Sequence, residues 1–265
     1  MKKILIIFIL IFSIKGFSQD SYFLGRTNYC TPQKAESKKS FETSFLALKY
    51  PKYYGGYTNL LMKTAKEDPN YCDAYFMAGY FFRLQDMHKE ALALYYIADS
   101  LAQNKALIFK QNLAVEFMRF DQLGHARKTY AEMIKYFPES PEGYYGMANT
   151  TIIVGDYDNG LEHLRKAEKL YKNSGSVKDD VKYMFGALYT FKEDYKTALP
   201  YLDEVYSTYK KEDVYLSIYA LAEIKVGTEN NDDSLKKKAK KHFEKIKEMN
   251  KVPENLQKKL KEYFY

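Results

Sequence analysis

Tryptophan is absent from this chain of 265 residues, and arginine is scarce. With 27 tyrosines and 17 phenylalanines, smaller aromatic rings must supply much of the packing volume. Only five of the 41 basic residues are arginine, and lysine is the weaker residue for bidentate recognition of phosphate or carboxylate. Hydrophobic residues make up 46% of the chain, which is enough for one or two cores or for one elongated array.

Recognisable catalytic motifs are also absent. The sequence has no His-Glu-x-x-His or Cys-x-x-Cys spacing for a metal, no Gly-x-Ser-x-Gly, no phosphate loop and no dinucleotide fingerprint. The four histidines are scattered, and acidic pairs such as Asp179-Asp180 are more typical of solvated helix starts than of cation sites. We therefore expect a protein that is not an enzyme and that uses no cofactor or metal, although an unrecognised spatial site is the alternative.

The first eighteen residues resemble an export signal. Lys2 and Lys3 precede an apolar run over residues 4–14, and Gly16-Phe17-Ser18 places small residues where a signal peptidase reads them. The run is shorter than the ~20 residues that span a bilayer, so we expect a signal peptide at 1–18 and a periplasmic or extracellular protein. An uncleaved anchor is the alternative.

Two cysteines, Cys30 and Cys72, follow the signal. An even number of cysteines in an oxidising compartment can pair, and two independent thiols are the alternative. Sequence spacing alone decides neither, because pairing depends on geometry. Cys30 belongs to a lead-in segment, residues 19–37, that precedes the regular part of the chain.

From residue 38 onward, small residues recur in pairs twelve positions apart. Bulky residues flank them at helical spacing, and successive pairs start 34 to 38 residues apart. One small residue on each of two amphipathic helices lets their backbones approach. These pairs are Gly79 with Ala91, Ala114 with Ala126, Ala148 with Gly160, and Gly186 with Ala198.

This pattern resembles the tetratricopeptide repeat, a helix-turn-helix unit of about 34 residues. The clearest copy contains Tyr75, Gly79, Phe82, Ala91 and Tyr95. The resemblance implies an all-α, right-handed superhelix of about five to six repeats. We place the array at residues 38–252 and a C-terminal capping helix at 253–265. Single copies are degenerate, but four in near-constant register are a strong signal.

Some residues depart from the repeat pattern. Lys110 and Lys182 occupy bulky positions, and Pro200 falls inside a second helix, which should start late or kink. Gly55-Gly56 indicates a helix–helix turn, and the polar composition of residues 227–234 indicates a surface insertion.

In this repeat class the first helices line a concave groove, so the resemblance implies a protein or peptide ligand there. The stripe beside the packing face supplies the candidate contacts, and aromatic residues with an occasional arginine suit such a partner. The alternative, burial of these rings between repeats, stays open. The candidates are Phe76, Tyr80, Arg83, Gln111, Val115, Met118, Tyr145, Asn149, Ile152 and Tyr183.

Lysine is concentrated near the C-terminus. Eleven lysines and four glutamates between Lys236 and Glu262 give a local charge of +7. This region is either a solvated helix pair or a contact for an anionic lipid or glycan. The leading hypothesis is an exported scaffold that binds a protein segment in its groove, in cell-envelope assembly or secretion. The alternative is a module that associates with an anionic surface through these lysines. Nucleic acid is not an expected partner.

Overall fold

The computed structural model describes residues 22–23, 28–175 and 178–265. These residues form α-helices and two short 3₁₀ helices, with no strand among them. They divide into two compact units, and the boundary in the chain lies between Pro138 and Glu139. The expected signal peptide at 1–18 lies outside the described residues. No helix in the described ranges is long and apolar enough to cross a membrane.

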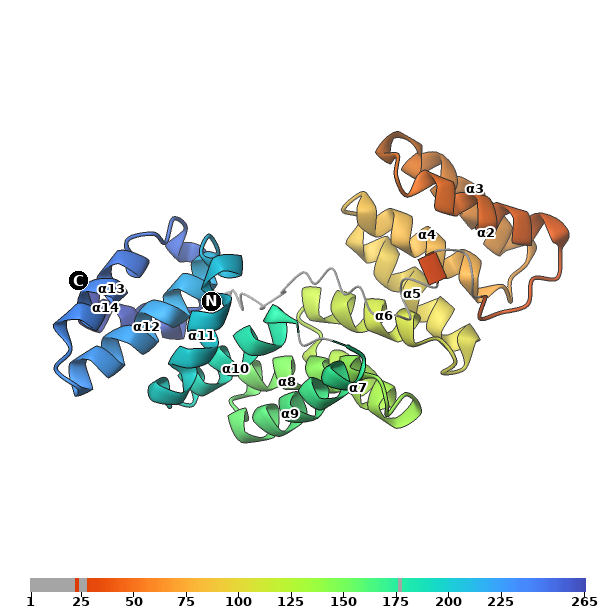
Figure 1. The fold of residues 1–265 in the computed structure, drawn as a ribbon. Helices are drawn as coiled ribbons and strands as arrows, with labels where there is room; N and C mark the ends of the chain where they lie inside the picture. Colours follow the sequence, from red (N-terminus) through yellow and green to blue (C-terminus); the bar gives the residue numbers. More distant parts are fainter. Residues whose placement is uncertain (1–21, 24–27, 176–177) are drawn as a thin grey trace. The chain divides into compact units, whose positions relative to one another are not determined.

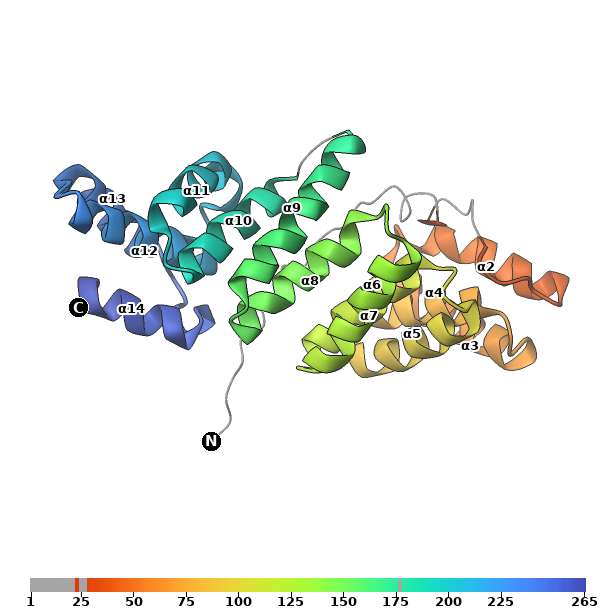
Figure 2. The ribbon, with the colours of Figure 1, turned by 90° about the horizontal axis from the view of Figure 1, so that it is seen from below.

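The N-terminal unit consists of three helix pairs, in which the second helix folds back along the first (Figures 1 and 2). Its helices are α2 (Ala35–Ala47), α3 (Tyr54–Glu67), α4 (Cys72–Leu84), α5 (His88–Ala102), α6 (Leu107–Arg119) and α7 (Leu123–Tyr136).

The C-terminal unit repeats this arrangement three times and adds one more helix, α14, which packs on α12 (Figure 2). Its helices are α8 (Pro141–Val154), α9 (Tyr157–Asn173), α10 (Asp179–Phe191), α11 (Tyr195–Tyr209), α12 (Asp213–Glu229), α13 (Asp233–Phe243) and α14 (Glu254–Phe264). Together the units contain six described helix pairs and a closing helix, as the repeat pattern predicts.

The small residues lie where the two helices of a pair touch. A Cβ on Gly160 would lie 2.1 Å from Thr151 Oγ1, and a Cβ on Gly186 would lie 2.6 Å from Leu202 Cδ2. Their partners Ala148 and Ala198 are fully buried. Close approach of the backbones therefore requires these residues, which is the physical reason for the twelve-residue spacing.

The tight turn inside each pair is also regular. Asp86, Asp121, Gly155 and Glu193 each follow the small residue of the first helix by seven positions, and each has a positive φ between 57° and 77°. This left-handed residue ends the first helix and reverses the chain. Only one of the four is glycine, so the turn geometry is held by the packed helices on either side.

Two local expectations are corrected. Gly55 and Gly56 lie in the first turn of α3 rather than in a turn between helices, because the chain already reverses around the short 3₁₀ helix Pro51–Tyr53. Helix α11 does not start late: it begins at Tyr195 and continues through Pro200. Pro200 is the sixth residue of the helix, beyond the first-turn N–H groups that have no intrahelical acceptor, so the helix continues although one backbone hydrogen bond is missing there.

Candidate functional site

The first helices of the N-terminal unit, α2, α4 and α6, are covered by part of the lead-in. The Tyr22 ring is fully buried and lies 5.7 Å from the ring of Phe41, 5.3 Å from Phe76 and 5.8 Å from Phe109 (centroid distances). These three phenylalanines come from the three first helices in turn. The first-helix face of this unit is therefore an aromatic pocket filled by a segment from outside the repeats.

Two further lead-in rings extend this contact. Phe23 lies 4.6 Å from Tyr80, and Tyr29 lies 5.2 Å from Phe109. Phe76 and Phe109 stack on each other at 4.3 Å beneath them. Aromatic pairs in such geometries contribute about 0.5–1.5 kcal/mol beyond the burial of their area.

The backbone of the lead-in is held by two buried carboxylates. Asp73, at the start of α4, accepts hydrogen bonds from the N–H groups of Tyr29 (3.1 Å to Oδ2) and Cys30 (2.9 Å). Asp68 accepts one from the Gln33 N–H (2.8 Å). These contacts use main-chain donors, so they fix the path of the segment and depend little on which side chains it carries.

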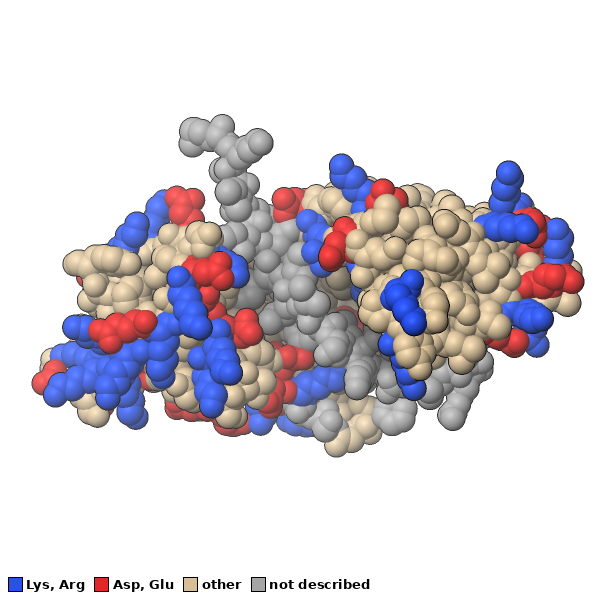
Figure 3. Space-filling model, turned by 90° about the horizontal axis from the view of Figure 1, so that it is seen from above, with Lys and Arg blue, Asp and Glu red and all other residues tan. Residues whose placement is uncertain are grey.

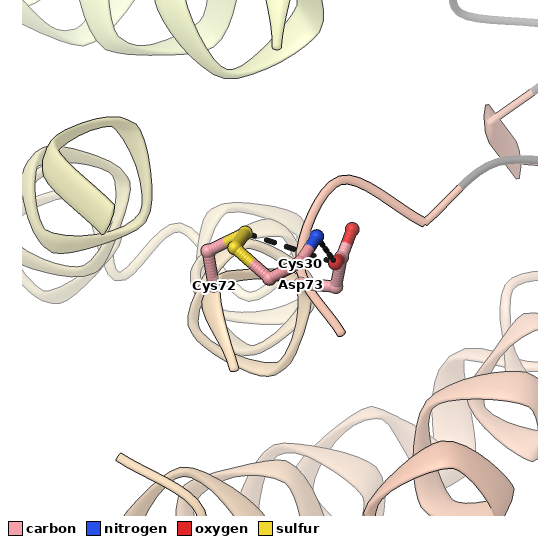
Figure 4. A group of neighbouring side chains, drawn as sticks. All are labelled: Cys30, Cys72 and Asp73. Atoms are coloured by element: carbon pink, nitrogen blue, oxygen red, sulfur yellow. Dashed lines mark hydrogen bonds between the residues drawn. A yellow bond between two sulfur atoms is a disulfide. The ribbon is translucent and has the colours of Figure 1, made fainter. Parts of the chain in front are cut away.

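A disulfide joins the same segment to α4. Cys30 and Cys72 are bonded, with their Cα atoms 5.6 Å apart, and Asp73 lies beside them (Figure 4). Cys72 is fully buried, whereas Cys30 is half-buried. The three side chains are close enough to hold an ion, but the sulfur atoms are bonded to each other and offer no thiolate. The structure therefore realises the disulfide alternative.

Asp73 is electrostatically unusual. Its side chain is fully buried, and this burial raises the pKa of its carboxyl to about 6, although the hydrogen bonds from Cys30 and Tyr29 oppose the rise. The backbone donors therefore offset only part of the desolvation cost of this charge.

The structure separates the ten candidate groove residues into two groups. Five are buried, with at most 6% of their surface exposed: Phe76, Gln111, Met118, Tyr145 and Tyr183. The other five are partly exposed: Tyr80, Arg83, Val115, Asn149 and Ile152.

For the rings of Phe76, Tyr145 and Tyr183, the structure shows the alternative that the sequence left open, namely burial. Tyr183 packs against Tyr209 and Tyr215 of its own unit. Phe76 differs, because part of its cover is the lead-in residue Tyr22. The five partly exposed residues keep their interpretation as ligand contacts, which stays a prediction.

Sequence reasoning missed a recurring carboxylate near the start of the first helices. Asp73, Glu142 and Asp180 each stand two positions before the bulky position of their repeat, which is occupied by Tyr75, Tyr144 and Lys182 in turn. In the C-terminal unit, Glu142 accepts a hydrogen bond from the Tyr171 hydroxyl (2.8 Å), and Asp180 accepts one from Tyr209. Comparing the copies two positions upstream of the repeat motif would have found them.

The two lysines at bulky positions have different environments. Lys110 is 1% exposed, and its Nζ lies 2.9 Å from Asp99 and 2.6 Å from Glu132, so it joins α6 to the second helices on both sides. Lys182 is 35% exposed and pairs with Glu204 at 2.6 Å. The first is a buried ionic bridge, and the second is a surface ion pair.

Each unit also contains a carboxylate–histidine pair between adjacent helices. His88 Nδ1 lies 3.0 Å from Glu116, and His242 Nδ1 lies 2.7 Å from Glu223. Both carboxylates are buried, and burial raises the pKa of each one.

The lysine-rich C-terminal region forms a surface with little compensating charge. Lys237, Lys238, Lys240 and Lys241 on α13 are exposed, and none is in an ion pair with another described residue. Figure 3 shows basic side chains gathered on the part of the C-terminal unit that includes α13.

Neither a protein-family model nor a curated protein matches this chain. Solved structures do match it. A chain of the APC/C hetero-tetramer Cut9–Hcn1 is 16% identical with a TM-score of 0.64; the match covers 94% of this chain but only 45% of that one.

Two further structures match over almost their whole length. Pseudomonas aeruginosa PilF is 15% identical with a TM-score of 0.63, and the match covers 86% of this chain and 97% of PilF. YrrB, described as a tetratricopeptide-repeat protein with an unusual peptide-binding site, is 15% identical with a TM-score of 0.52 over 76% of this chain and 97% of YrrB. The helix pairs, their small-residue contacts and these similarities together show that the chain has the tetratricopeptide-repeat fold.

Proposed function

We propose that the protein is a non-enzymatic scaffold that binds a segment of another protein on the first-helix face of its repeats. The observation that carries this proposal is the seated lead-in. That face of the N-terminal unit already holds a segment from outside the repeats through aromatic rings and backbone hydrogen bonds. A surface that accepts one such segment has the chemistry to accept another.

The similar structures support the same kind of activity. One is a hetero-tetramer of two named proteins, and another is described as having a peptide-binding site. In this chain, the partly exposed residues Tyr80, Arg83 and Val115 provide a contact surface in the N-terminal unit, and Asn149 and Ile152 provide one in the C-terminal unit. The Arg83 guanidinium lies 4.7 Å from the centre of the Tyr80 ring and donates to Asn112 Oδ1 at 2.9 Å, so it is held in place.

Affinity capture with matched variants tests this function. Tyr80→Ala should weaken capture of a stoichiometric protein partner by about tenfold or more, because an aromatic interface anchor contributes ~1–4 kcal/mol. The control is Tyr96→Ala, which removes an exposed tyrosine from the second helix α5. Equal capture by both variants, with unchanged melting temperatures, would exclude the first-helix face near Tyr80 as the contact.

We propose further that the protein is exported and acts in cell-envelope assembly or secretion. Lys2, Lys3 and the short apolar run support an export signal, and the Cys30–Cys72 disulfide suits an oxidising compartment. Mass spectrometry of the protein from its native cells tests this. An N-terminus at residue 19 is expected, and an intact N-terminus at Met1 in the cytosol would contradict it.

A second candidate function is association with an anionic surface through α13. The four exposed lysines without ion pairs favour it, since each lysine near an anionic membrane adds about 1 kcal/mol of attraction. The protein should co-sediment with vesicles that contain phosphatidylserine and not with phosphatidylcholine vesicles. Replacing the four lysines by glutamine should abolish this; co-sedimentation that survives the replacement would rule out α13.

A further inference from the structure

The three recurring carboxylates provide an internal comparison. Glu142 and Asp180 each take a hydrogen bond from a tyrosine hydroxyl that lies 29 residues later, on the second helix of the same pair. In the C-terminal unit, each of these repeats therefore supplies a donor for its own carboxylate. Neither needs a group from outside the repeat.

The pair α4–α5 has the carboxylate without the tyrosine. The residue 29 positions after Asp73 is Ala102, which is buried and carries no hydrogen-bond donor in its side chain. A buried carboxylate without a donor is costly, so this repeat requires donors from elsewhere. In the structure, the backbone N–H groups of Tyr29 and Cys30 provide them.

The surroundings of Asp73 recognise aromatic side chains as well as the two N–H donors. Phe41, Phe76 and Phe109 form a pocket that encloses the Tyr22 ring, and Tyr29 packs on Phe109. A segment that fits here offers aromatic side chains to the pocket and two successive backbone N–H groups to Asp73. Backbone recognition combined with ring pockets is a general mode of peptide binding.

The lead-in is attached to this site by a bond that can be broken. Cys30 is half-buried, whereas Cys72 is fully buried, so Cys30 is the more accessible residue of the disulfide. Once that bond is broken, the contacts that hold the described part of the segment are non-covalent, such as its rings and its hydrogen bonds, and other segments can compete with it.

We propose that this face of the N-terminal unit is a binding site for a partner segment with aromatic side chains and two successive backbone N–H groups for Asp73, and that the lead-in occupies it until the Cys30–Cys72 disulfide is reduced. This proposal rests on the scaffold function above and names the partner chemistry and the control of that site.

The reductant is a dithiol, which supplies the two electrons. Its thiolate attacks Cys30 Sγ, a mixed disulfide forms, and the bond to Cys72 breaks; Cys72 leaves as a thiolate and takes up a proton. The second thiol of the reductant then attacks the mixed disulfide, closes the reductant's own disulfide and releases Cys30 as a thiol. Both cysteines end as thiols, and the lead-in is no longer covalently attached to α4.

A peptide with the lead-in's own chemistry is the probe. We use a fluorescent DSYFLGRTNYSTPQ, residues 20–33 with serine at position 30. Because the tethered lead-in competes at a high effective concentration, the receiving protein is the full chain with Tyr22→Ala and Cys30→Ser. Fluorescence anisotropy should show binding at least about tenfold tighter than to the oxidised wild type.

Matched variants locate the binding. Adding Asp73→Ala to the receiving protein should abolish it, whereas adding Glu142→Gln in the C-terminal unit should leave it unchanged. A control peptide with alanine in place of both tyrosines should not bind. A folded receiving protein that does not bind the probe, or that binds it equally well with Asp73→Ala, would overturn the proposed site.

Alkylation of the reduced wild type is an independent measurement, useful also if the receiving variant does not fold. Cys72 should react with iodoacetamide at a rate within about tenfold of Cys30, because departure of the lead-in uncovers it. A Cys72 that stays protected after reduction would show that the lead-in does not leave, and would overturn the redox control. The scaffold function is judged separately, by the effect of Tyr80→Ala on partner capture.

Discussion

Both units have a carboxylate at the same position of the repeat, but the groups that donate hydrogen bonds to it differ between the units. In the C-terminal unit, Glu142 and Asp180 are bonded by Tyr171 and Tyr209 of their own repeats. In the N-terminal unit, Asp73 is bonded by backbone from outside the repeats. These C-terminal repeats supply the hydrogen-bond donor for their own carboxylate, whereas the N-terminal repeat that contains Asp73 receives its donors from the lead-in. The difference teaches that one repeat pattern can satisfy the same carboxylate with a donor from its own repeat in one unit and with donors from a preceding segment in the other.

The largest difference between the units should appear at the two matched lysines. Lys110→Met removes a buried cation that bridges Asp99 and Glu132, and should lower the free energy of unfolding by about 3–5 kcal/mol. Lys182→Met removes a surface pair and should cost less than about 1 kcal/mol. Urea denaturation of both variants measures this. Equal losses would mean that the two positions are alike despite their burial.

Removal of the disulfide should weaken only the N-terminal unit. The bond links residues 42 positions apart, so Cys30→Ser with Cys72→Ser should cost about 2–4 kcal/mol. Hydrogen exchange should increase in α4 and remain unchanged in α10, which serves as the internal control. A similar loss of protection in α10 would contradict the prediction that the disulfide stabilises the N-terminal unit alone.

The stability of the C-terminal unit should depend more on its tyrosine hydroxyls than on the disulfide. Tyr171→Phe leaves the buried Glu142 without that donor and should cost about 1–3 kcal/mol. Tyr96→Phe, at an exposed tyrosine, should change stability by less than about 0.5 kcal/mol. Thermal melts compare the two, and an unaffected Tyr171→Phe would show that Glu142 does not depend on the hydroxyl.

The smallest effect is the pH dependence that Asp73 adds. Because its pKa in the folded protein is about 6, above the ordinary value of 3.8, its stabilising contribution is fully present below pH 3.8 and is lost as the pH rises through 6. Between pH 7 and pH 5, the wild type should therefore gain about 1 kcal/mol relative to Asp73→Asn, which cannot titrate. Chemical denaturation at the two pH values measures the difference. A relative loss at pH 5 would reverse the sign and refute the raised pKa.

The helix pairs were predictable because their contacts are local. Gly160 meets Thr151 within one helix-turn-helix unit, so the twelve-residue spacing carries the information. The role of Lys110 was not predictable, since its partners Asp99 and Glu132 lie on two different helices. The role of a charged residue at a bulky position can be inferred only when its partners on the adjacent helices are known.

The candidate site was predictable only in part. Tyr80 and Arg83 are partly exposed beside the packing face, as helical periodicity predicts. Phe76 is covered, because Tyr22 reaches it from a segment more than fifty residues earlier that has no repeat pattern. Periodicity describes contacts between repeats and contains no information about a segment outside them.

The closing helix α14 has a consequence for how such a chain can lengthen. It buries Leu256 and Leu260, stacks Phe264 on Phe243 of α13 and reaches back with Lys259 to Glu193. It therefore occupies the side of α12 on which another helix pair would pack. A helix pair duplicated between earlier pairs would leave the contact of α14 with α12 in place, whereas a pair inserted between α13 and α14 would separate α14 from α12.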